Sequence, residues 1–155
     1  MTRLLRRRLA RLGDDRGTNL IEAAILTPLL LFVTFAIVEF GMLFFIYLTL
    51  ENGVSQATRY AVTGQMVAGM DREQSIRHAM RTASPTLTLP DGAFEFSHLP
   101  AAGGGWTPGT GGPSEIGRVT VNYTWTFFTP LVRVLFADGR INLVVESAMM
   151  NERYE

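Results

Sequence analysis

The sequence predicts an α+β fold in which a long N-terminal membrane-spanning helix precedes a short helix and a small antiparallel β-sheet. Three observations predict this fold. An almost uninterrupted apolar run covers residues 20–50. Apolar residues at helical spacing follow that run, and strict two-residue alternation appears only towards the C-terminus. Helices and strands that are segregated along a chain in this way are typical of α+β proteins.

The composition narrows the classes of function. The 155 residues include no cysteine, and 18% of them are charged, against about 25% in an average soluble domain. Without cysteine the chain offers no disulfide scaffold, no thiol nucleophile and no cysteine-based metal site. The formal net charge is zero, but residues 1–16 carry six of the fourteen arginines and only two of the fourteen carboxylates. Residues 1–16 are therefore net basic, and the rest of the chain is net acidic.

The apolar run is long enough for a transmembrane helix. Residues 23–38 carry no charge, and residues 20–50 contain only Glu22 and Glu39 as charged side chains. About 20 apolar residues cross a bilayer as a helix, whereas a helix of a soluble protein normally keeps a polar face. Positively charged flanks stay on the cytoplasmic side of the membrane. We therefore expect the N-terminus in the cytoplasm and the C-terminal part in a periplasm-like space, which argues against a nucleic-acid-binding arm.

The junction between the basic N-terminal residues and the apolar run carries an unusual pattern. Gly17 ends the charged leader, Thr18 follows it, and Glu22 lies just inside the apolar segment. A carboxylate in lipid is costly unless it has a partner, so Glu22 is a candidate functional residue. The segment DDRGTNLIEAAILTPLLLF resembles the type IV prepilin processing motif. The resemblance implies that a prepilin peptidase cuts after Gly17 and leaves Glu22 at mature position five.

Cleavage after Gly17 would create a positively charged α-amino group on Thr18. We expect Glu22 of one subunit to pair with that amine on a neighbouring subunit. Such a pair neutralises two groups that are costly in an apolar bundle, and it fixes the axial register of the helices. The alternative is an uncleaved signal anchor in which Glu22 lies at the level of the lipid headgroups.

The predicted transmembrane and assembly helix covers residues 18–66. Pro28 removes one backbone hydrogen bond, and we expect it to kink the helix. Glu39 is a second buried carboxylate, which either pairs with a cation of a partner subunit or lies near the outer membrane face. Spacings of three and four around Val54 and Ala57 predict that an amphipathic helix continues beyond the membrane.

The segment IVEFGMLFFIYLTLENGVSQATRYAV makes the likeness more specific. Together with Gly17, Glu22 and Pro28, it resembles the TadE-like minor pseudopilins of the tight-adherence (Tad/Flp, type IV-like) pilus system over residues 16–61. The resemblance implies a pilin-like architecture and a structural role in pilus assembly, adhesion and biofilm formation. It also implies a single-pass protein of the bacterial inner membrane with a periplasmic or extracellular C-terminal domain, which can enter the pilus. The implied partners are the prepilin peptidase, other pilin or pseudopilin subunits and the inner-membrane assembly platform.

Residues 67–155 are expected to form the exported α+β domain, which begins with a short helix. Asp71 and Gln74 have the spacing of a capping box, and Ser84–Pro85 should end the helix that they open. Residues 86–98 then predict a β-hairpin around the turn pair Asp91–Gly92.

The remaining residues of the domain predict two strands and a loop. Alternation in residues 118–128 places one set of side chains on a common face, and a shorter set follows the next turn. These sets are Val119, Val121, Tyr123, Trp125 and Phe127, and then Ile141, Leu143 and Val145. Residues 101–114 contain six glycines and two prolines, which predicts a flexible loop. Trp106 in this loop is a candidate partner contact, although packing back onto the sheet is the commoner arrangement for tryptophan.

No catalytic or cofactor-binding pattern is evident in the sequence. His78 and His98 lack metal-ligand spacing, and the glycines of residues 103–112 lack the lysine and the following helix of a phosphate-binding loop. We therefore expect no enzymatic activity, catalytic residue, metal, cofactor, nucleic acid or small-molecule substrate. One alternative is an unprocessed single-pass protein whose periplasmic domain binds a partner or ligand. Another is a secreted domain released by ordinary signal peptidase near Ala36.

Overall fold

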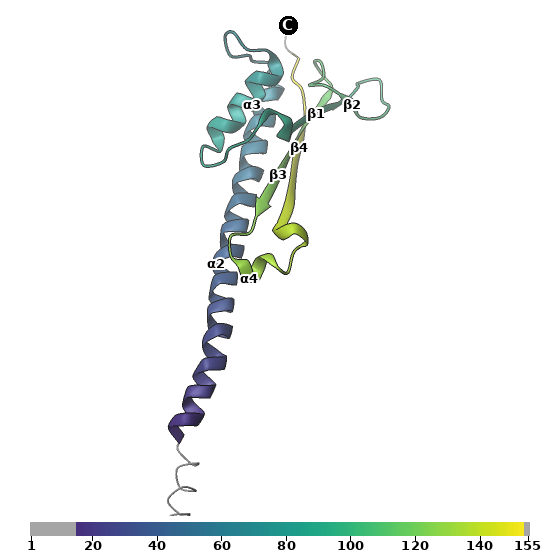
Figure 1. Cartoon of the computed structure of the whole chain (residues 1–155). Coiled ribbons are helices and arrows are strands. Elements are labelled where there is room, and N and C mark those ends of the chain that lie inside the picture. Colours follow the sequence, from purple (N-terminus) through teal and green to yellow (C-terminus); the bar gives the residue numbers. More distant parts are fainter. Residues whose placement is uncertain (1–14, 154–155) are drawn as a thin grey trace, which may run out of the picture.

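The computed structural model describes residues 15–153 and confirms the predicted α+β class. One long helix, α2 (Asp15–Val62), extends from the domain as a stalk, and the rest of the chain packs around its C-terminal half (Figure 1). The other helices are α3 (Arg72–Ala83) and α4 (Pro130–Arg133), with 3-10 turns η1 (Asp91–Ala93) and η2 (Ala137–Gly139). The strands are β1 (Phe94–Leu99), β2 (Thr107–Pro108), β3 (Ile116–Thr126) and β4 (Arg140–Met150).

The long helix has two halves with different surroundings. It is continuous through Pro28 and comprises 48 residues, which is about 72 Å at 1.5 Å per residue. Residues 17–38 are exposed apart from two half-buried positions, Phe32 and Ala36. In the second half one face is buried, formed by Leu43, Ile46, Leu50, Val54, Ala57 and Ala61. Their spacing of three and four places them in one stripe, which confirms the predicted amphipathic helix end.

Helix α3 begins and ends where the sequence predicts. Asp71 caps it with a reciprocal pair of hydrogen bonds: the Gln74 N–H donates to Asp71 Oδ1 (2.7 Å), and the Asp71 N–H donates to Gln74 Oε1 (3.2 Å). The helix ends at Ser84, whose N–H donates to the Met80 carbonyl (2.9 Å). Ile76 and Met80 are buried in the core that α3 shares with α2. The capping box therefore fixes the start of a helix that covers one side of α2.

The four strands form one antiparallel sheet in the order β2-β1-β3-β4. Val121 of β3 lies opposite Phe94 of β1 and Val145 of β4. Val119 and Val121 are buried, and Tyr123 and Trp125 are half-buried. Asn122 and Thr124, which alternate with them, are exposed. The predicted alternation is therefore confirmed. The inward face of the sheet packs on the buried stripe of α2, and this layer is the core of the domain.

The predicted hairpin across residues 86–98 is wrong. Residues 86–89 form no strand, the Asp91–Gly92 pair lies in the 3-10 turn η1, and only the segment after that turn is a strand. Leu89 is instead buried in the core, and its carbonyl accepts hydrogen bonds from Arg81 Nε (3.0 Å) and Nη2 (2.8 Å). The carbonyl that a hairpin would need is thus used by α3. The second neighbour of β1 comes from the glycine-rich segment, where Pro108 and Thr107 pair with Ser97 and His98.

Candidate assembly surface and the Glu39 contact

The proposed processing site lies at the exposed start of α2. Gly17, Thr18 and Glu22 are all exposed on its first turns. Within the described part of the chain, no residue forms a hydrogen bond or an ion pair with the Glu22 carboxylate. The basic leader of residues 1–17 lies outside the described residues except at its last three positions. Glu22 is thus an accessible carboxylate on an apolar helix.

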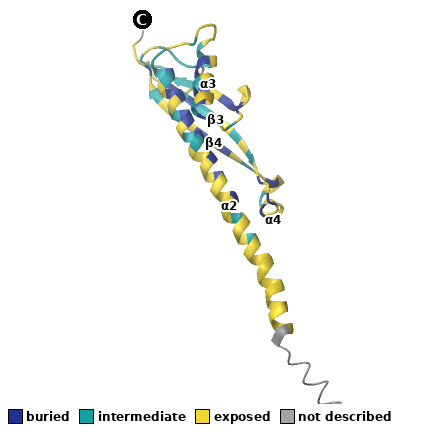
Figure 2. Cartoon of the chain, turned by 90° about the vertical axis from the view of Figure 1, so that its left-hand side faces the viewer, coloured by how far each residue is buried: buried dark blue, intermediate teal, exposed yellow. Residues whose placement is uncertain are grey.

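The first half of α2 presents apolar side chains on every side. Figure 2 shows this half exposed along its whole length, whereas the second half is buried on the side that faces the sheet. Large apolar side chains exposed here include Leu20, Ile21, Ile25, Leu29, Leu30, Val33, Ile37 and Val38. The exposed apolar strip continues beyond residue 39 on the side away from the domain, as Met42, Phe44, Phe45 and Leu48. Apolar surface of this extent requires lipid or other protein to cover it.

Glu39 lies where the exposed stalk meets the domain, and it is fully buried. Its Oε1 accepts a hydrogen bond from the Phe128 N–H (2.6 Å), and its Oε2 accepts one from the Thr129 N–H (2.9 Å). Thr129 is the N-cap residue of α4, so the carboxylate meets backbone donors at the start of that short helix. Hydrogen bonds to a charged acceptor are among the stronger ones in proteins. Both oxygens of Glu39 are therefore used within the chain.

Trp106 is packed against the sheet and yet remains partly open. The Arg118 guanidinium of β3 lies 4.1 Å from the centroid of its ring, and the side chain is 43% exposed. A shallow groove beside it is lined by Glu95, Phe96, Ser97, Trp106, Thr107, Pro108, Arg118 and Thr120. The cation–π contact holds the ring on the sheet, and its open edge is the part that a partner could reach.

A larger open groove of about 680 Å³ runs between α2 and α3, and the sequence offered no signal for it. Its polar lining includes Arg59, Tyr60 and His78. These residues lie on two helices and meet only after α3 folds back onto α2, so no sequence motif joins them. In residues 15–153, no three histidine, aspartate or glutamate side chains gather closely enough to hold a metal ion.

Comparison with known proteins found a similarity for the long helix α2 alone. Residues 17–59 match the family model described as TadE-like protein, and this range covers α2 from Gly17 almost to its end. No curated protein and no solved structure matches the chain. The TadE-like family is a structural, non-enzymatic group associated with Tad pili, and one apolar N-terminal helix fits a single-pass membrane protein of such a system. The resemblance drawn from the sequence is thereby confirmed: residues 17–59 are TadE-like, consistent with a TadE-like pseudopilin of the Tad pilus system.

Proposed function

We propose that this chain is a minor pilin, or pseudopilin, of a Tad/Flp-type pilus, which a prepilin peptidase cuts after Gly17 and which assembles through α2. One observation carries the proposal. The first half of α2 is an exposed apolar surface with a single accessible carboxylate, Glu22, four residues after Thr18. The TadE-like match, which begins at Gly17, supports the same assignment.

The assembly mechanism follows from the charges at the start of α2. After cleavage, the Thr18 amine is a cation at neutral pH, and Glu22 offers an anion that no described residue of its own chain engages. Packing of two α2 helices brings apolar surfaces together, and the pair of Glu22 with a neighbour's Thr18 amine selects one axial offset. Glu39 plays no part in this register, because the domain of its own chain occupies both of its oxygens.

The size of the folded domain favours a minor component over the bulk of a filament. Residues 67–153 form a sheet and helices that flank one side of the second half of α2, so along that half neighbouring helices can approach only the other side. A subunit of this shape suits initiation, capping or support of a pilus at the membrane assembly platform. Roles in adhesion and biofilm formation would follow from the pilus itself.

Processing is tested on the native protein. Intact mass and N-terminal sequencing are compared for chain purified from its own membranes with and without the prepilin peptidase. We expect a Thr18 start that depends on the peptidase, that is lost in Gly17→Val and that persists in the matched control Gly13→Val. A Met1 start in the presence of the peptidase would support an unprocessed single-pass protein with a partner- or ligand-binding domain. A start at Ile37 would indicate release by ordinary signal peptidase.

Assembly is tested separately from processing. Glu22→Ala should leave membrane insertion and cleavage intact and should remove the chain from the pilus or reduce piliation, whereas Glu22→Asp should retain partial function because it keeps the charge. Glu51→Gln, further along α2, is the matched control. Normal piliation in the Glu22→Ala strain would overturn the pairing with the Thr18 amine.

A further inference from the structure

The connection between β3 and β4, residues 127–139, combines a packed interior with an apolar outer surface. Phe127 and Phe136 stack with their ring centroids 4.2 Å apart, and Val132 is fully buried beneath the segment. Four other apolar side chains point outward: Phe128 (53% exposed), Leu131 (56%), Val134 (85%) and Leu135 (67%). An ordered loop that keeps four large apolar side chains outside needs lipid or other protein to cover them.

The Glu39 contact fixes the position of this loop along α2. Because Phe128 and Thr129 bond to Glu39, the loop lies beside the helix at that residue, as Figure 1 shows for α4. Thr18 and Glu39 are separated by 21 residues, about 32 Å of helix at 1.5 Å per residue. The hydrocarbon core of a bilayer is about 30 Å thick. If α2 enters the membrane at the start of its apolar run, Glu39 and the loop reach the opposite boundary.

Most backbone N–H groups of the loop donate within the protein, as contact with lipid favours. The Phe128 and Thr129 N–H groups donate to Glu39. Further N–H groups donate to carbonyls of the same loop: Arg133 to Thr129, Val134 to Pro130, Leu135 to Val132, Phe136 to Arg133, Gly139 to Phe136 and Phe127 to Gly139. Pro130, at the first position of α4, has no N–H to satisfy. The outer surface of the loop therefore needs few hydrogen bonds from water.

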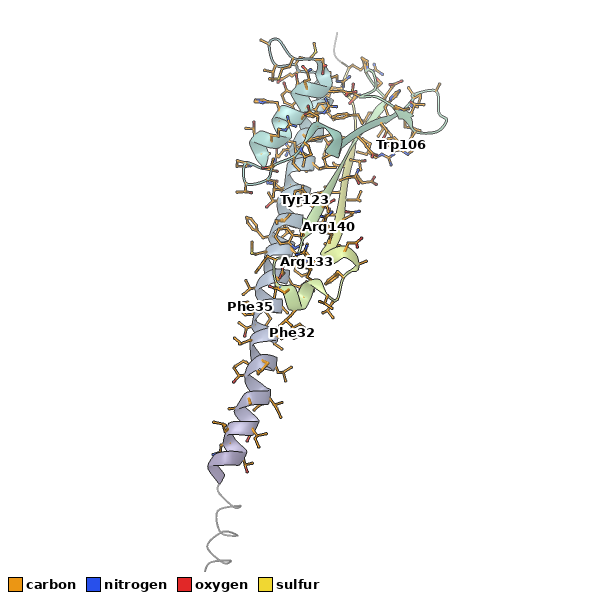
Figure 3. All side chains as sticks on the ribbon, viewed as in Figure 1. Phe32, Phe35, Trp106, Tyr123, Arg133 and Arg140 are labelled. Carbon is orange, nitrogen blue, oxygen red and sulfur yellow. The ribbon has the colours of Figure 1, made fainter. Side chains whose placement is uncertain are left out.

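Two arginines flank the apolar surface. Arg133 and Arg140 are both exposed, and neither forms an ion pair with any residue of the described range 15–153. Asp138 is the only carboxylate in residues 127–140. Figure 3 shows the two arginines on the domain side of Phe32 and Phe35, above the exposed stalk. Cations just outside an apolar surface suit the phosphates of anionic lipid headgroups.

We propose that the β3–β4 connection is a second membrane contact: Phe128, Leu131, Val134 and Leu135 enter the outer leaflet of the bilayer that α2 crosses, and Arg133 and Arg140 bind lipid phosphates. Glu39 holds the loop at this depth. The inference rests on α2 crossing the membrane and does not depend on cleavage after Gly17 or on the pilus.

Lipid fits this surface better than a second copy of the chain. A neighbouring α2 offers no carboxylate at this height except its own Glu39, whose oxygens are already bonded. Two arginines facing an apolar helix would then lack a counter-charge, whereas lipid phosphates supply one. The loop also continues the exposed apolar surface of residues 20–38, so one hydrocarbon layer can cover both.

The absence of native cysteine makes a spin-label test direct. The full chain carrying Val134→Cys or Leu131→Cys is labelled with a nitroxide and reconstituted in vesicles of phosphatidylcholine and phosphatidylglycerol. Val144→Cys, exposed on the outer face of β4, is the matched control. We expect the loop labels to be relaxed more by oxygen than by a water-soluble nickel chelate, and the Val144→Cys label to show the opposite preference.

Two further experiments test whether lipid or another copy of the chain covers the loop. In the Arg133→Gln/Arg140→Gln background, the oxygen preference at Val134→Cys should fall and should lose its dependence on phosphatidylglycerol. A nickel preference at both loop positions in vesicles would overturn the proposal. Dipolar broadening between Val134→Cys labels, persisting when the lipid-to-protein ratio is raised, would also overturn it, because the loop would then contact another copy of the chain. Neither result bears on processing, which the N-terminal mass reports independently.

Discussion

Gly53 of α2 lies directly against the hydroxyl of Ser84, the residue at which α3 ends. A Cβ placed on Gly53 would overlap Ser84 Oγ and would come within 3.2 Å of Met80 Cε. Ser84 is fully buried, and its hydroxyl donates to the Thr49 carbonyl (3.2 Å), one turn before Gly53 on α2. The glycine therefore serves close packing of two helices rather than a turn, and it sets how near α3 lies to the stalk.

Gly53→Ala should destabilise the domain, although alanine is the better helix former by about 0.5–1 kcal/mol. Overpacking at this contact should cost about 1–3 kcal/mol, measured by thermal unfolding of the full chain in detergent. Gly41→Ala is the matched control, because no atom lies within 4 Å of its added Cβ, and it should be neutral or slightly stabilising. The double variant Gly53→Ala/Ser84→Ala should recover part of the loss. A Gly53→Ala protein as stable as Gly41→Ala would contradict this account of the helix contact.

Glu39→Gln should loosen the β3–β4 connection. The two N–H groups bond to different carboxylate oxygens, and in glutamine one of those positions becomes an NH2 donor. The Phe128 or the Thr129 N–H then loses its acceptor, and an unpaired buried donor costs about 1–3 kcal/mol. Hydrogen exchange of those two amides should accelerate, while exchange in β3 and β4 changes little. Glu51→Gln, which alters the bond from the Tyr47 hydroxyl (2.7 Å), is the control. Unchanged exchange at Phe128 and Thr129 would mean that the carboxylate does not hold the loop.

The contact between Trp106 and Arg118 should appear as a coupling energy. A double-mutant cycle of Trp106→Ala and Arg118→Ala should give about 0.5–1 kcal/mol, as expected for a partly exposed cation–π pair. Arg118 also donates to Ser97 Oγ (3.0 Å), and the cycle removes this shared contribution. Trp106→Ala and Arg81→Ala, which lie far apart, should change the free energy of unfolding additively when they are combined. If Trp106→Ala and Arg118→Ala were also additive, Arg118 would not hold the Trp106 ring, and the ring would be free to bind a partner.

The ion pair of Asp91 with Arg81 should make stability depend on pH at the acidic end. The Arg81 guanidinium, 2.6 Å from Asp91 Oδ1, hydrogen-bonds that carboxylate and attracts it, which lowers the pKa of Asp91 below its ordinary 3.8. A lowered folded-state pKa contributes stability that is present above the unfolded-state pKa and is lost as pH falls through the folded value. The free energy of unfolding of the wild type should therefore be larger than that of Asp91→Asn at neutral pH. The two values should converge in strong acid. Because Asp91 is exposed, high salt should shrink the difference, and a difference that persisted in strong acid would exclude this pair as its source.

The sequence predicted the elements whose signals are local. The capping box of Asp71 and Gln74 lies within a single helical turn, and the alternation from Val119 to Trp125 lies within a single strand, so each signal is complete in the segment that it describes. The TadE-like segment was also recognisable, because its features are consecutive along α2.

The contacts missed by sequence reasoning join residues far apart in the chain. Glu39 was singled out as a buried carboxylate, but its partners are the backbone N–H groups of residues 89 and 90 positions away, and backbone donors leave no mark in the sequence. Residues 86–89 have the alternation of a strand, and they failed to form one because Leu89 is buried and bonds to Arg81. In both cases tertiary packing overrode the local pattern.

The domain is attached to α2 near both ends of the segment that it covers. Glu39 bonds to the start of α4 at one end, and the Glu152 N–H donates to the Val62 carbonyl (3.0 Å) at the other. Tension applied along the stalk would therefore be shared between two attachments, with the eleven-residue strands β3 and β4 forming a brace between them. If one attachment ruptured, the other and the core between them would still hold the domain to α2 and limit its extension under load.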